Sequence, residues 1–108
     1  MPFAVLLTND AARDLDEIYD YIALYDAPQK ADYVLEQIEK AFSRLSGSPG
    51  RGAYPKEMLS MGIREYREVF FKSYRIIYRV MDKNVYVLLI VDGRRDMQLL
   101  LQRRLLDA

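Results

Sequence analysis

The side chains best suited to chemistry in this sequence are arginines in and around predicted strands. Arg75 and Arg79 stand four residues apart in the segment YRIIYRV. In a strand they would share one face, about 13 Å apart, opposite a face that is apolar or aromatic. Arg67 lies in the segment before them, and the pair Arg94 and Arg95 follows the next apolar run.

The pattern leaves two interpretations of these arginines open. If the strand register is suitable, Arg67, Arg75 and one arginine of the later pair form a cluster that could bind phosphodiester oxygens. Otherwise the arginines belong to a solvated sheet face and pair with nearby carboxylates. The candidate carboxylates are Glu65, Glu68 and Asp96.

The absence of other reactive side chains limits the possible chemistry. The chain has no histidine and no cysteine, which excludes a Ser-His-Asp triad, a cysteine nucleophile, disulfides and thiolate metal sites. Asp16 and Asp20 stand one helical turn apart. A two-carboxylate metal site could use this spacing, but a polar helix face produces it routinely. We therefore expect no metal and no cofactor.

The composition is typical of one folded domain. The 108 residues are 51% hydrophobic and 30% charged, and we expect a single domain over residues 1–108. No apolar run approaches the roughly 20 residues that cross a bilayer. The start MPFAVLL lacks the basic region of a signal peptide. We expect a cytoplasmic protein that does not engage membranes.

The charges are segregated along the chain although the formal net charge is +0. Residues 1–50 carry four basic and nine acidic side chains, whereas residues 51–108 carry twelve basic and seven acidic ones. Such a division predicts a basic face that suits phosphates or an acidic protein segment. Alternatively, the two halves complement each other across the fold.

Two apolar stripes of helical spacing follow a short buried strand at Phe3–Leu7. Thr8 or Asn9 can cap the first helix, and Asp26-Ala27-Pro28 separates it from the second, which should end at Ser46-Gly47. So short a link predicts an antiparallel helical hairpin. The stripes consist of Ala11, Leu15, Ile18, Ile22 and Tyr25, and of Ala31, Leu35, Ile38, Phe42 and Leu45.

The second half of the chain reads as a loop, three strands and a helix. Residues 46–62, SGSPGRGAYPKEMLSMG, are predicted to be a mobile surface loop. Strands should follow over Ile63–Phe71, Tyr74–Met81 and Val85–Val91, the last central and covered on both faces because it is almost wholly apolar. Asp96 can cap a leucine-rich helix that either folds over the second sheet face or waits for a partner.

These elements predict an α+β domain with an N-terminal strand, a helical hairpin, a three-stranded antiparallel meander and a C-terminal helix, in one or two layers. In this order, SPGRG, REYREVFFKSYRIIYRV and VYVLLIVDGRRD, followed by a basic leucine helix, resemble the RelE/ParE superfamily of toxins from type II toxin–antitoxin systems. The resemblance covers essentially the whole chain.

The resemblance implies one of two activities. RelE-like members are ribosome-dependent endoribonucleases that cut mRNA with a basic cluster and usually a C-terminal tyrosine, without a metal. ParE-like members share the fold, lack that constellation and poison DNA gyrase. If the chain is RelE-like, the catalytic residues would be Arg67, Arg75, Arg94 and Arg95.

Departures from the RelE pattern favour the ParE-like branch. Two positions after Arg67, where RelE-like members carry a basic residue, this chain has Val69. The tyrosine position falls near Leu100 or Leu101, and no tyrosine follows Tyr86, so little remains for proton transfer. We expect an inhibitor of DNA gyrase. The alternatives are a RelE-like nuclease acting on the ribosome and mRNA, and a degenerate, non-toxic binding domain.

The resemblance also implies a cognate antitoxin that joins the toxin in a hetero-oligomer. Its acidic or amphipathic segment is expected to bind against the basic sheet face and the leucine helix. Arg79 carries no such expectation and is interpreted as structural. The residues expected to bind are Arg75, Arg94, Arg95, Leu100, Leu101 and Leu105.

Overall fold

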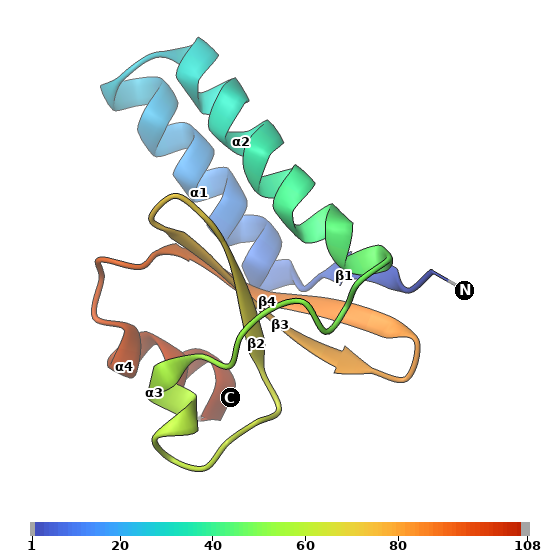
Figure 1. The fold of residues 1–108 in the computed structure, drawn as a ribbon. Coiled ribbons are helices and arrows are strands. Elements are labelled where there is room, and N and C mark those ends of the chain that lie inside the picture. The colour runs from blue at the N-terminus through green and yellow to red at the C-terminus, as the bar shows by residue number, and fades with distance from the viewer. Residues whose placement is uncertain (1, 107–108) are drawn as a thin grey trace.

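A four-stranded sheet lies between two layers of helices in the computed structural model, which describes residues 2–106 (Figure 1). The α+β class predicted from the sequence is confirmed. The elements are β1 (Ala4–Leu7), α1 (Asn9–Tyr25), α2 (Pro28–Ser43), the 3₁₀ turn η1 (Arg44–Ser46), α3 (Lys56–Leu59), β2 (Arg67–Phe71), β3 (Tyr74–Met81), β4 (Asn84–Asp92), α4 (Met97–Leu101) and the π-helical turn η2 (Gln102–Leu106).

The sheet has the order β1-β4-β3-β2, so the N-terminal strand joins the meander as a fourth strand. Strand β1 pairs with β4 in parallel, whereas β4, β3 and β2 are antiparallel. Strand β2 begins at Arg67 and not at Ile63 as predicted, because the residues from Ile63 to Tyr66 do not pair with the sheet. The amide of Ile63 donates to the carbonyl of Met58 at 3.0 Å and closes the turn after α3 instead of entering the sheet.

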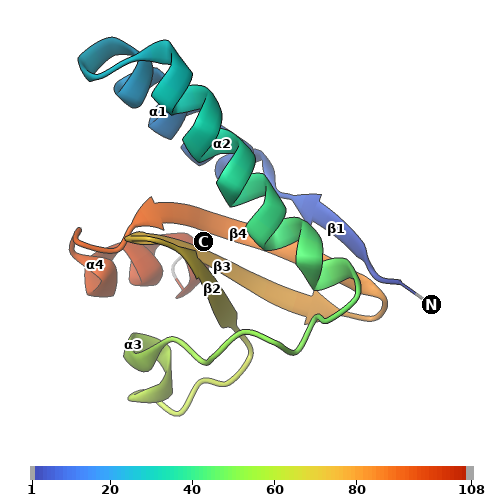
Figure 2. The same ribbon diagram turned by 45° about the horizontal axis from the view of Figure 1, so that its top comes forward.

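The helical hairpin of α1 and α2 covers one face of the sheet (Figure 2). The hydroxyl of Thr8 caps α1 by accepting from the amide of Ala11 at 3.1 Å, and Pro28 begins α2. Both features agree with the sequence prediction. The buried stripes of the two helices pack against the side chains that β3 and β4 direct to this face, including Ile76, Tyr78 and Ile90.

Helices α3 and α4 lie on the opposite face of the sheet (Figure 2). The second core cluster there contains Met58, Tyr66, Ile77, Leu89, Val91, Met97 and Leu101. The carboxylate of Asp96 caps α4 by accepting from the amide of Leu99 at 3.2 Å. The leucine-rich helix therefore folds over its own sheet, and the domain has three layers where the sequence predicted one or two.

The edge of β4 is left open beyond Val87, where β1 ends, and an ion pair closes it. A bulge at Leu88 shifts the register with β3. The carbonyl of Leu88 accepts from the Arg104 guanidinium at 3.2 Å, and the amide of Ile90 donates to the Asp14 carboxylate at 3.1 Å. Arg104 and Asp14 also contact each other at 2.8 and 3.1 Å. This clamp joins α1 to the C-terminal turn and blocks strand addition at this edge.

The segment 46–62 contains α3 and is hydrogen-bonded to the sheet, whereas the sequence predicted a mobile surface loop. The Tyr78 hydroxyl donates to the carbonyl of Pro49 at 2.7 Å and accepts from the amide of Gly52 at 3.1 Å. Ala53 exchanges two backbone hydrogen bonds with Glu68, at 2.8 and 3.1 Å. A Cβ at Gly52 would lie 2.6 Å from the Glu68 carbonyl oxygen and from the Tyr78 hydroxyl, so the approach requires glycine.

We expect Gly52→Ala to reduce the free energy of unfolding by about 1–3 kcal/mol, because the added methyl must push the segment away from Tyr78. Gly50→Ala is the matched control, since a Cβ there would meet nothing within 4 Å; its change should stay below about 1 kcal/mol. Urea unfolding of the three proteins measures both effects. Equal losses in the two variants would contradict this account of the segment.

Candidate functional site

Arg75 is buried in an ion cluster that joins three elements. Its side chain, on β3, is 8% exposed. The Nε atom donates to Glu68 on β2 at 2.6 Å, and the two terminal nitrogens donate to the two carboxylate oxygens of Glu57 on α3 at 2.8 Å each. Gly93 lies so close that a Cβ there would stand 2.7 Å from the Arg75 Cδ. Arg75 therefore belongs neither to a solvated face nor to an open anion site.

The electrostatics of the cluster favour the charged forms of Glu57 and Arg75. Hydrogen bonds from Arg75 lower the pKa of the Glu57 carboxyl against the opposing effect of burial. The hydrogen bonds that Arg75 donates to Glu57 and, to a smaller extent, to Glu68 raise the pKa of its guanidinium. Two carboxylates thus balance one guanidinium. Little of its charge remains to stabilise negative charge on a substrate, although the predicted binding role of Arg75 stays a prediction.

Arg67 and Arg75 lie on opposite faces of the sheet, so the register does not bring these two arginines into one cluster, which was one of the two interpretations of the sequence. Arg67 is paired with Tyr78 across the β2–β3 ladder and shares its face. Arg75 stands three residues before Tyr78 and points to the other face. The guanidinium of Arg67 donates to the Gly52 carbonyl at 2.8 Å and to the Tyr54 hydroxyl at 3.1 Å, and it stacks over the Tyr54 ring.

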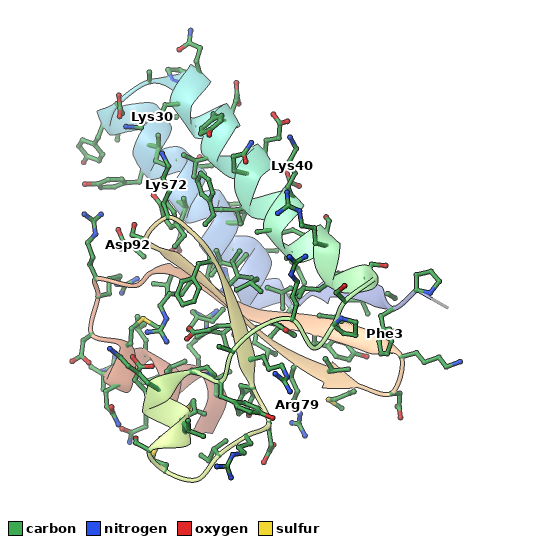
Figure 3. The ribbon with its side chains drawn as sticks, viewed as in Figure 1. Phe3, Lys30, Lys40, Lys72, Arg79 and Asp92 are labelled. Carbon is green, nitrogen blue, oxygen red and sulfur yellow. The ribbon has the colours of Figure 1, made fainter. Side chains whose placement is uncertain are left out.

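The remaining arginines lie at two separate places. Arg94 and Arg95 follow β4 and are exposed; the Arg94 Nε contacts the Asp92 carboxylate at 3.0 and 3.1 Å. Arg79 contacts Glu65 at 3.3 Å. Figure 3 shows Arg79 and Asp92 towards opposite ends of the sheet. Of the predicted catalytic set, Arg94 alone shares a hollow with Arg75; this hollow measures about 420 Å³ and is also lined by Lys56 and Lys72.

The three predicted binding leucines pack against the chain's own sheet. Leu101 is fully buried in the second core cluster, and Leu100 and Leu105 pack partly buried against it. Leu99, which was not predicted, is the more exposed leucine of this helix. A binding role for the three leucines stays a prediction. In this structure the three side chains cover one face of the sheet.

A more spacious hollow than the one near Arg75 lies between the tip of the helical hairpin and the end of the sheet. This hairpin–sheet cleft measures about 690 Å³. Figure 3 shows Lys30, Lys72 and Asp92 together at this end of the molecule. Arg94 and Arg95 both line the cleft, so the structure places this predicted pair at one surface. Its walls include Glu17, Ile18, Tyr21, Tyr25, Lys30, Phe71, Lys72, Tyr74, Asp92, Arg94 and Arg95.

The interpretation of the sequence missed an exposed group at the hairpin tip. Tyr25 was assigned to the buried stripe, but it is exposed, as are Tyr21 and Leu24. The prediction for Tyr25 is wrong because α1 extends beyond the sheet at this end, and the described elements leave the outer face of its last turn uncovered (Figure 1). Tyr21 and Leu24 lie outside the predicted apolar stripe. Large apolar residues outside the buried stripe are the sequence signal from which an exposed apolar group could have been predicted.

The described residues offer no second kind of site. Over residues 2–106, no three acidic side chains come together in a way that could hold a metal ion. Within the same range, no helix combines the length and the apolar composition needed to cross a membrane. The surface features that remain for function are the hairpin tip, the cleft beside it and the hollow near Arg75.

The fold is that of the RelE/ParE toxin superfamily. The chain superposes with a TM-score of 0.71 on a protein of the chromosomal ParDE toxin–antitoxin system of P. aeruginosa, which is 26% identical, over 83% of this chain and 95% of that one. A chain of the RelBE2 toxin–antitoxin complex from Mycobacterium tuberculosis is also 26% identical. It superposes with a TM-score of 0.56 over 85% of this chain and 92% of that one.

The chain belongs to the family described as ParE toxin of type II toxin-antitoxin system, parDE. The model of that family matches residues 5–97. Toxin ParE3 of Caulobacter vibrioides is 29% identical over 93 residues, which are 86% of this chain and 89% of that protein. The ParE-like branch favoured from the sequence is therefore confirmed.

We expect Glu57→Gln to destabilise the fold by about 1–3 kcal/mol near neutral pH, because a charge-assisted pair with Arg75 is lost. The parental protein should lose this contribution in acid. Since Arg75 lowers the folded-state pKa of Glu57 below its ordinary value of 4.5, the stabilisation is complete above that value and disappears as the pH falls through the lower, folded-state pKa.

Urea unfolding between about pH 7 and pH 3 tests this expectation, and the two stability curves should converge at the acid end. Glu65→Gln is the control, because Glu65 is exposed and contacts Arg79 at 3.3 Å; it should follow the parental curve throughout. A constant gap between Glu57→Gln and the parent over this range would contradict the role given to the ionised carboxylate.

Proposed function

We propose that this ParE-family toxin inhibits DNA gyrase in the cytoplasm and is neutralised by a cognate antitoxin with which it forms a hetero-oligomer. Family membership supports the toxin role. The two solved relatives come from a ParDE toxin–antitoxin system and a RelBE2 toxin–antitoxin complex. Their assembly supports an antitoxin partner for this chain as well.

The dispersal of the arginines is the observation that supports inhibition by binding over RNA cleavage. A RelE-like nuclease would need Arg67, Arg75, Arg94 and Arg95 around one phosphodiester. Here Arg67 faces the helical hairpin, while Arg75 is neutralised on the other side of the sheet by Glu57 and Glu68. Leu100 and Leu101 occupy the positions near which a catalytic tyrosine was expected, and they pack against the core. Such a surface has no evident group for proton transfer.

The antitoxin is proposed to bind across the sheet face that carries Arg75 and Arg94. The hollow there is rimmed by Lys56 and Lys72, neither of which has an ion pair among the described residues. An acidic segment would therefore find unpaired positive charge. Its path would continue to Arg95 and over the partly exposed sides of Leu100 and Leu105, with Leu101 supporting them from below.

Expression of the toxin without antitoxin, with translation and DNA supercoiling followed together, tests the proposal. We expect cells to filament and accumulate DNA damage while protein synthesis continues. Purified toxin should inhibit supercoiling by gyrase, and adding the antitoxin should reverse the inhibition. Cleavage of ribosome-bound mRNA with unaffected gyrase would instead establish the RelE-like activity. Unimpaired growth at high expression would indicate a non-toxic binding domain.

A further inference from the structure

The outer face of α1 near its C-terminal end carries apolar side chains that the fold does not use. Tyr21, Leu24 and Tyr25 are 66%, 75% and 72% exposed. The two tyrosine rings contact each other with centroids 4.8 Å apart. Figures 1 and 2 show this end of the hairpin projecting away from the sheet. Three large apolar side chains within five residues at a projecting tip are typical of a contact surface for another protein.

Carboxylates flank these side chains on the same helix. Glu17 is one turn before Tyr21, and Asp20 is one turn before Leu24, so the four lie on adjacent rows of α1. Neither Glu17 nor Asp20 has a basic side chain within ion-pair distance over residues 2–106. We call the five residues Glu17, Asp20, Tyr21, Leu24 and Tyr25 the acidic–aromatic stripe.

The charge of the whole hairpin has the same sign. Residues 9–46 carry nine acidic and four basic side chains. A partner that fits the acidic–aromatic stripe must therefore offer an apolar recess with a basic rim. Glu17, Tyr21 and Tyr25 also line the hairpin–sheet cleft, where Lys72 and Arg94 supply positive charge. Phosphates and an acidic antitoxin segment suit that basic part of the cleft, whereas the carboxylates of the stripe itself disfavour them.

An enzyme that acts on DNA meets this requirement, because the surfaces that hold the phosphate backbone must be basic. We propose that the acidic–aromatic stripe is the surface with which the toxin engages gyrase, and that it docks on a basic, partly apolar surface of the enzyme that otherwise faces DNA. This inference rests on the proposed function and adds which part of the toxin reaches the target.

Two sets of substitutions separate the apolar contribution from the charge. The triple variant Tyr21→Ser, Leu24→Ser, Tyr25→Ser removes the apolar side chains, and its control is Leu59→Ser, Met61→Ser, which removes two exposed apolar side chains at 39% and 46% exposure near α3. The double variant Glu17→Gln, Asp20→Asn removes the charges. Its control, Glu36→Gln, Glu39→Gln, makes a matching change in charge on α2.

Binding to immobilised gyrase and inhibition of supercoiling are measured at low and at moderate salt. We expect the triple variant to bind gyrase at least about 10-fold more weakly and to lose inhibition accordingly. The charge variant should associate more slowly and depend less on salt than the parent. Both controls should behave as the parent. Circular dichroism, urea midpoints and affinity for the antitoxin should be unchanged in every variant.

Each remaining outcome overturns the inference in a distinguishable way. Inhibition by the parent and the triple variant at equal concentrations would remove the stripe from the gyrase interface and leave the proposed function intact. Loss of antitoxin affinity with gyrase binding unchanged would assign the stripe to the antitoxin. Absence of gyrase inhibition by the parent itself would overturn the proposed function together with this inference.

Discussion

Burial of β4 on both faces is the constraint on which the rest of the structure depends. The strand directs Val85, Val87 and Ile90 to one face and Leu89 and Val91 to the other. Exposing either set of apolar side chains to water would cost free energy. Two cover layers are therefore required. The helical hairpin supplies one and the short helices α3 and α4 supply the other. The leucine-rich helix α4 is therefore required by the fold itself, whether or not it also contacts a partner.

Charge is used internally wherever these layers meet the sheet. Arg75 joins α3 to two strands through Glu57 and Glu68, and the Asp14–Arg104 pair closes the open edge of β4. Such pairs lose hydration on burial, so each must have its hydrogen bonds completed. The consequence for function is direct. Arginines committed to holding the fold have little positive charge left to act on RNA.

What remains on the surface is suited to contact with proteins. Among the described residues, the hairpin presents exposed aromatic rings and carboxylates without an ion pair, such as Glu17 and Asp20, while Lys56 and Lys72, also without one, line the hollow on the sheet side. The opposite signs of the two chain halves therefore do not simply cancel across the fold. They give the molecule surfaces of opposite sign, which meet at the hairpin–sheet cleft, where Glu17 lies among the lining residues with Lys72 and Arg94.

The sequence by itself determined the elements other than α3, together with the α+β class and the toxin family, because caps such as Thr8 and Asp96 and the periods of helix and strand are local properties. Tertiary structure alone decided the functional geometry. A strand period shows which residues of one strand share a face, but register decides that Arg67 and Arg75 are separated. Likewise, the burial of Arg75 and the exposure of Tyr25 depend on which distant elements pack against them. No local sequence pattern encodes that packing.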